Sequence, residues 1–189
     1  MRRVFVALVA CAVAVVLCGS LATAKLEESK IRCATCRKAI SYVWQEGEAL
    51  RRHCADEATD IRCEYNGIHH FGVEEMVSNV CDKLPRKHQA VTNDKDDFDL
   101  VPHDDPQHAK EDADAIRKAC HKWLHEEHGL DQVALYMYAN LDAQKPTHMI
   151  LPGLQDRYCR AACNPNHKQS QNVHDPDLHD AHYRRNTDL

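Results

Sequence analysis

Two short cysteine pairs, far apart in the chain, constrain its fold more than any other feature. Cys33 and Cys36 are three residues apart, and Cys159 and Cys163 are four apart. Both spacings place the two side chains on one face of a helix. Two such helices lying side by side could therefore be joined by two disulfides. If the helices are antiparallel, the outer bridge is Cys33–Cys163, the inner bridge is Cys36–Cys159, and the residues between form a closed loop.

The N-terminal residues have the pattern of a secretory signal peptide, which we assign to residues 1–24. Arg2 and Arg3 precede an unbroken apolar run, Val4 to Leu17, and Ala22-Thr23-Ala24 forms a small-x-small cleavage site. A membrane anchor is the alternative, but spanning a bilayer needs about 20 apolar residues, more than this run provides. The sequence therefore predicts a mature chain that enters an oxidising compartment.

The mature chain keeps eight cysteines, an even number that is typical of a secreted disulfide framework. They are Cys33, Cys36, Cys54, Cys63, Cys81, Cys120, Cys159 and Cys163. Eight cysteines allow 105 pairings, so their number alone does not give the connectivity. The formal net charge of −5 becomes −7 once Arg2 and Arg3 are removed. This acidity argues against nucleic acid and anionic membranes as steady partners.

Apolar residues recur mostly at three- and four-residue steps, which predicts an all-α fold. The first expected helix is Leu26–Glu46, with a weak break at Gly47 and a resumption over Glu48–His53. The second is Val73–Leu84, stopped by Pro85, and the third runs from Asp105 to about His128. The last two are Val133–Leu141 and Leu151–Cys163, the latter stopped by Pro165. Pro146–Pro152 is expected to be a connector.

Three segments lack a helical stripe. Residues 54–68 contain Asn66-Gly67, a tight-turn sequence, so a small hairpin or an irregular loop is expected between the first two helices. Residues 86–105 are rich in acidic residues and are expected to form an exposed insertion. Residues 164–189 are rich in His, Asp and Asn and are expected to be a disordered tail, which leaves 25–163 as the folded domain.

The order of the cysteines and their flanking residues resembles that of a known family. The stretches that carry the resemblance are Arg32–Lys38 with its Cys-Ala-Thr-Cys, Val73–Leu84 with its Cys-Asp-Lys-Leu, and Ile116–His128 around Cys120. Together they resemble the canopy family, the saposin-like proteins of the endoplasmic reticulum. The resemblance implies a saposin-like fold stapled by Cys33–Cys163, Cys36–Cys159 and Cys81–Cys120. Cys54 and Cys63 lie outside that pattern and most simply bridge each other.

The family resemblance also implies a function and a location. It implies a non-enzymatic binding protein, a co-chaperone or adaptor for client proteins or chaperones in the lumen of the endoplasmic reticulum. Canopy proteins often end in a retrieval tetrapeptide, and this chain ends in Asn186-Thr187-Asp188-Leu189. Asp188 and Leu189 have the right character, but Asn186 and Thr187 do not match. Secretion is therefore the alternative to retention.

Three rival activities have some support in the residues. Cys33 and Cys36 could form a thiol oxidoreductase site, but Cys33 lies within a helical stripe with no strand before it. His121, His125 and His128 share a helix face, and the His/Asp-rich tail offers loose ligands, yet no closed set of metal ligands is visible. A saposin-type lipid binder is the third rival, and the acidic surface disfavours it. We expect no catalytic residues, no metal and no cofactor.

Overall fold

The structure is a computed structural model that describes residues 26–56, 59–64, 67–95, 97–103, 109–143 and 146–164. The predicted signal peptide, the predicted tail beyond residue 164 and the C-terminal tetrapeptide lie outside these ranges. So does the expected helix start at Asp105-Pro106.

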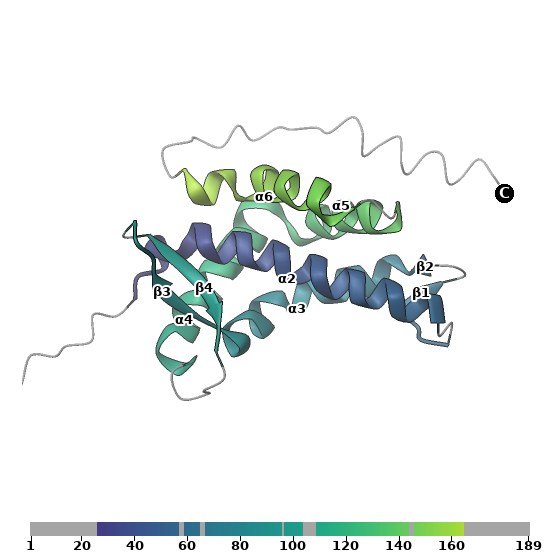
Figure 1. Cartoon of the computed structure of the whole chain (residues 1–189), viewed down its shortest axis with the longest axis horizontal. Coiled ribbons are helices and arrows are strands. Elements are labelled where there is room, and N and C mark those ends of the chain that lie inside the picture. The colour runs from purple at the N-terminus through teal and green to yellow at the C-terminus, as the bar shows by residue number, and fades with distance from the viewer. Residues whose placement is uncertain are drawn as a thin grey trace, which may run out of the picture.

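A single long helix, α2 (Glu28–Asp56), lies at the centre of the molecule (Figure 1). Its buried stripe includes Ile31, Cys36, Ile40, Val43 and Trp44, at the three- and four-residue steps of an amphipathic helix. The predicted break at Gly47 is wrong, because the helix continues through it. Gly47 is buried in the core, and its tertiary contacts outweigh the low helix propensity of glycine.

Two predicted proline boundaries are also wrong. Helix α3 (His70–Lys87) includes Pro85, and helix α6 (Thr147–Cys163) includes Pro152. The turn after Pro85 contacts α2 through Lys87 Nζ, which donates to the Tyr42 hydroxyl at 3.0 Å. The Thr147 hydroxyl, in the first turn of α6, accepts a hydrogen bond from Trp44 Nε1 at 3.1 Å and donates one to Glu48. The segment expected to be a connector is therefore mostly helical.

The acidic insertion is a β-hairpin rather than an exposed loop. Strands β3 (His88–Thr92) and β4 (Phe98–Pro102) pair antiparallel, with His88 opposite Pro102 and Thr92 opposite Phe98. Leu100 is buried, and Ala90 and Phe98 pack against the core. Only a few apolar residues therefore anchor the hairpin to the core. Because charged residues are more numerous in this segment, its sequence predicts an exposed loop.

The remaining elements complete a mostly helical domain. Helix α4 (Ala109–His121) passes into a π-helical segment, η1 (Lys122–His128), so the predicted third helix changes its winding at Lys122. Gly129, with a φ of +75°, separates η1 from α5 (Leu130–Asp142). The short strands β1 (Cys63–Glu64) and β2 (Gly67–Ile68) form the small hairpin expected after the first helix.

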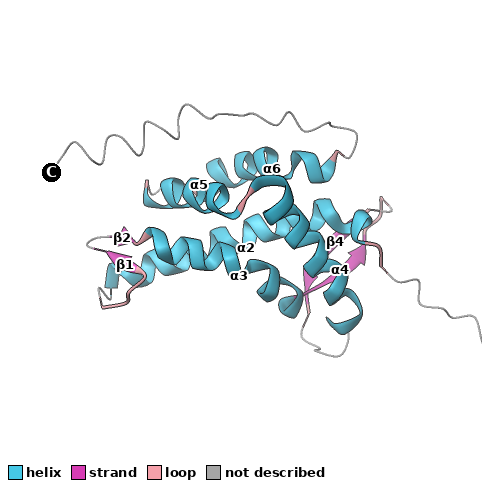
Figure 2. Cartoon of the chain, turned by 180° about the vertical axis from the view of Figure 1, so that it is seen from behind, coloured by secondary structure: helices cyan, strands magenta, loops and turns pink. Residues whose placement is uncertain are grey.

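The layers are arranged around α2. Helices α3, α4 and α6 all pack directly against α2 (Figure 1), and α5 packs mainly against α3. The two small sheets lie at opposite ends of α2, which is also clear from behind (Figure 2). Trp44, Trp123, Ile116, Leu124 and Met137 are among the largest side chains of the shared core. The fold is a disulfide-stapled, mostly helical domain.

Candidate functional site

Two disulfides join the ends of α2 and α6. Cys33 bonds to Cys163 and Cys36 to Cys159, with Cα–Cα distances of 4.5 and 5.6 Å. These are the two bridges that antiparallel helices require. A Cys-x-x-Cys oxidoreductase site instead needs Cys33 and Cys36 to bond to each other during its cycle. In this structure both sulfurs are occupied by bonds to another helix.

A third disulfide, Cys81–Cys120, joins α3 to α4, and both of its cysteines are fully buried. This is the pair that the family resemblance implies. It closes a segment that contains the β3–β4 hairpin. The two helices that flank the hairpin are therefore covalently linked whatever the hairpin does.

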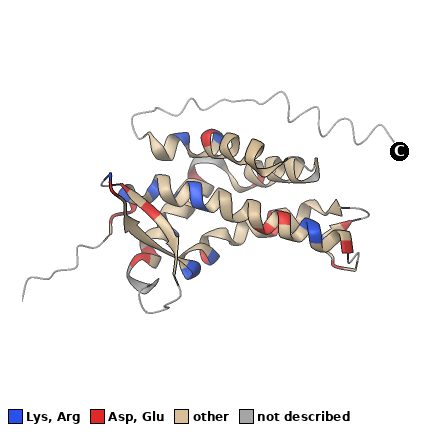
Figure 3. Cartoon of the chain, in the orientation of Figure 1, with Lys and Arg blue, Asp and Glu red and all other residues tan. Residues whose placement is uncertain are grey.

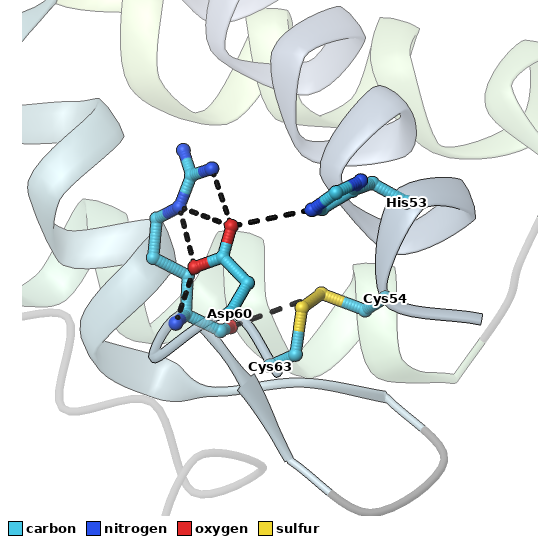
Figure 4. Close-up of a disulfide and its surroundings, with 5 residues drawn as sticks. His53, Cys54, Asp60 and Cys63 are labelled. Carbon is cyan, nitrogen blue, oxygen red and sulfur yellow. Dashed lines mark hydrogen bonds and ion pairs between the residues drawn. A yellow bond between two sulfur atoms is a disulfide. The ribbon is translucent and has the colours of Figure 1, made fainter. Parts of the chain in front are cut away.

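The fourth disulfide, Cys54–Cys63, lies at the other end of α2 and closes a short loop. Asp60 lies within that loop and accepts hydrogen bonds from Arg62. The ring of His53 also contacts the Asp60 carboxylate (Figure 4). The Arg62 Nη2 to Asp60 Oδ2 distance is 2.6 Å, and His53 Nε2 lies 3.3 Å from the same oxygen. We call residues 54–56 and 59–64 together with His69–Gly72 the stapled end.

The contacts of Asp60 perturb its protonation. Hydrogen bonds from the Arg62 side chain and then from the Arg62 backbone N–H lower the pKa of Asp60 well below its ordinary range. The same side-chain hydrogen bond raises the pKa of Arg62. Asp60 is thus an ionised carboxylate that holds the loop, and its lone pairs are already committed to hydrogen bonds within the stapled end. We assign it a structural role.

Helices α3 and α5 hold the stapled end from outside the loop. The His69 backbone N–H donates to the Arg62 carbonyl at 2.7 Å, and the Tyr138 hydroxyl donates to Glu64 Oε1 at 2.9 Å. Gly72 lies so close to the loop that an added Cβ would stand 2.9 Å from Arg62 Cβ and 3.1 Å from the Arg62 carbonyl oxygen. This approach needs a glycine, because any side chain at residue 72 would push the loop away.

The stapled end also carries apolar side chains that are exposed to solvent. Three large apolar residues are exposed among those that the structure describes, namely Ile61, Phe71 and Met149. Ile61 is 81% exposed and Phe71 is 49% exposed, and both belong to the stapled end. Sequence reasoning missed them because neither belongs to a periodic stripe. The one sequence feature that could have indicated exposure is the position of Ile61 between Asp60 and Arg62, in a short segment without a helical pattern to bury it.

The histidines considered as metal ligands are only partly brought together. The rings of His121 and His125 stack with their centroids 5.3 Å apart. Over the described residues, no group of three or more His, Cys, Asp or Glu side chains is placed to hold a metal ion. The side chain of His128 and the histidines of the tail lie outside that part of the chain.

Acidic and basic residues are mixed over the described part of the chain in the view of Figure 3. Both kinds occur along α2 and on several of the other elements. No helix within the described ranges is both long and apolar enough to cross a membrane. The chain matches no family model, no curated protein and no solved structure. The stapled end carries two of the three large apolar side chains that are exposed among the described residues, and it is the candidate site.

Proposed function

We propose that this protein is a non-enzymatic binding protein of the secretory pathway that contacts client proteins through its stapled end, as a co-chaperone or adaptor. The observation that carries the proposal is the exposure of Ile61 and Phe71 on a part of the chain that is otherwise tightly fixed. Apolar side chains in solvent contribute to binding when a partner removes them from water, at about 25 cal/mol per Å² of apolar area buried.

The rigidity of the stapled end supports a binding role. Cys54–Cys63, the Asp60–Arg62 ion pair and the close approach at Gly72 fix the backbone on both sides of Ile61. A binding loop that is already ordered loses less conformational freedom on association than a flexible one. More of the free energy gained by burying Ile61 and Phe71 then contributes to affinity.

The location of this activity rests on the sequence. Four disulfides fit an oxidising compartment, and the resemblance to canopy proteins favours the lumen of the endoplasmic reticulum over secretion. The thiol oxidoreductase alternative is less well supported, because Cys33 and Cys36 each bond to α6. The lipid-binding alternative receives less support, because large apolar side chains such as Trp44 and Trp123 are already buried in the core.

A client-holding assay tests the proposal. A reduced, denatured secretory protein is diluted into buffer with the purified mature chain, whose disulfides are intact, and aggregation is followed by light scattering. We expect the wild type to suppress aggregation and the double variant Ile61→Ser, Phe71→Ser to lose most of that effect. Replacing two exposed side chains should leave the melting temperature nearly unchanged.

The matched control is Met149→Ser, which removes an apolar side chain that is 67% exposed but lies on α6. It should behave like the wild type. Equal loss in the control and in the double variant would show that general surface hydrophobicity, rather than the stapled end, is responsible. Full activity in the double variant would refute a role for the stapled end.

A further inference from the structure

His88 occupies the junction between α3 and the β3–β4 hairpin. It is the first residue of β3 and is only 6% exposed, although histidine has a titratable ring. Its Nδ1 lies 3.2 Å from the carbonyl oxygen of Leu84, and its ring meets the ring of Tyr42 edge-on at 6.3 Å. A neutral imidazole that donates through Nδ1 satisfies this arrangement.

His103 occupies the other end of the same hairpin. It follows Pro102, which pairs with His88, and its backbone N–H donates to the Lys87 carbonyl at 3.2 Å. Both ring nitrogens of His103 are buried, and neither has a hydrogen-bond partner among the residues that the structure describes, although the residue as a whole is only half-buried. Each end of the hairpin therefore meets the helices at a histidine, which is buried at residue 88 and half-buried at residue 103.

The charged groups around this junction come from every element packed against it. Helix α2 contributes Lys38 and Tyr42, α3 contributes Lys87, and α4 contributes Asp112. Lys87 Nζ donates to the Tyr42 hydroxyl at 3.0 Å. This hydrogen bond raises the pKa of Lys87, and the negative charge of Glu46 raises it further. Asp112 is the carboxylate on the α4 side, and its Oδ2 accepts from the backbone N–H of residue 90 at 3.0 Å.

Protonation of His88 is opposed by this environment. Burial lowers the pKa of His88 below its ordinary value, and the positive charges of Lys38 and Lys87 lower it further, against the hydrogen bond to the Leu84 carbonyl. A histidine whose pKa is lower in the closed than in the open state binds its proton preferentially when open. Closure is then most favourable above about pH 6.5, the ordinary pKa of histidine, and weakens as pH falls below it.

We infer that the β3–β4 hairpin is an acid-sensitive flap, which opens from α2 and α4 when His88 gains a proton. Opening exposes Leu100 and the apolar surface that it covers, while Cys81–Cys120 keeps α3 and α4 together. The flap is independent of the stapled end, which lies at the opposite end of α2 (Figure 1). The inference therefore does not depend on the proposed client-binding role.

The size of the effect follows from proton linkage. If His88 has its ordinary pKa in the open state and stays neutral in the closed state, lowering the pH from about 7.5 to about 5.5 raises the opening constant about tenfold. That value is the limit for His88 alone. The helices joined by disulfides are expected to show no matching change.

Native-state hydrogen exchange on the full mature chain tests the inference. Protection of residues 88–102 is compared with that of α2 and α3 at about pH 7.5 and 5.5, after correction for the intrinsic exchange rate. We expect the opening constant of the hairpin to rise toward tenfold in the wild type. The variant His88→Asn should flatten that rise, because an asparagine side chain keeps a donor for the Leu84 carbonyl but cannot titrate.

The control is His148→Asn, which replaces an exposed histidine on α6 and should leave the rise intact. If His88→Asn does not fold, the wild-type comparison still decides the matter. A wild-type hairpin whose opening constant is equal at the two pH values overturns the inference. So does a rise in folded His88→Asn as large as in the wild type.

Discussion

Replacing Gly47 by alanine should destabilise the protein even though alanine is the better helix former. In the middle of a helix, glycine to alanine ordinarily stabilises by about 1 kcal/mol. At Gly47, however, the new Cβ would stand 2.5 Å from Leu141 Cδ1 and 3.2 Å from Cδ2. Leu141 is only 1% exposed, so its side chain must turn within a packed core. Overpacking of this kind costs about 1–3 kcal/mol.

The net expectation for Gly47→Ala is therefore a loss of about 0–2 kcal/mol in the free energy of unfolding. Gly153 provides the matched control, because it also lies inside a helix and an added Cβ there meets nothing within 4 Å. Gly153→Ala should stabilise by up to about 1 kcal/mol. Urea denaturation with the disulfides intact, followed by circular dichroism, should separate the two variants by about 1–3 kcal/mol.

A double-mutant cycle identifies the cause. Leu141→Ala alone should cost about 2–5 kcal/mol, because it leaves a cavity. In that background, Gly47→Ala should no longer destabilise, since the added methyl group occupies space that Leu141 has vacated. If Gly47→Ala stabilises the wild type as much as Gly153→Ala does, the close packing of α2 on α5 is not what requires a glycine at residue 47.

Three further results are expected. Replacing both Cys54 and Cys63 by serine should cost about 2–3 kcal/mol, the chain-entropy value for a loop of about ten residues, and a thermal melt that moves by less than about a degree would contradict it. Because the pKa of Asp60 is lowered in the folded state, its contribution to stability is present above about pH 4 and is lost as pH falls further. Asp60→Asn should thus flatten the decline of the urea midpoint in acid, and an unchanged decline would exclude Asp60 as its source. Adding one glycine after Leu189 should shift the protein into the medium if the C-terminus is a retrieval sequence; a wild type that is already secreted, and unaffected by the glycine, would refute this.

The parts of the fold that the sequence predicts well are those with a strong local pattern. The stripe of α2 repeats over many turns, and Cys33 and Cys36 share its face, so both the helix and its covalent partner could be anticipated. The boundaries predicted at Pro85 and Pro152 are wrong because contacts from other elements fix the turns beside these prolines. Thr147, for example, bonds to two side chains of α2, at sequence separations of 103 and 99.

The hairpin and the candidate site were harder to predict for a related reason. Leu100 is a buried apolar residue among acidic neighbours, and its burial depends on α2, which is distant in sequence. Ile61 and Phe71 have no sequence pattern at all, because exposure is a property of the finished surface. Likewise, nothing in the sequence shows that His88 and His103 face the same junction. Pairing of β3 with β4 creates that proximity.

The Cys33–Cys163 bond makes the domain nearly circular. Its two attachment points have Cα atoms 4.5 Å apart although they are separated by 130 positions in sequence. A pulling force applied to the two ends of the domain would pass directly through this bond, so the helices between them would bear almost no tension. Because the two attachment points are so close, the domain could also be inserted into a surface loop of another protein without separating the two sides of that loop. One disulfide near the N-terminal end of α2 would thus carry the applied force and also keep the two ends of the domain together.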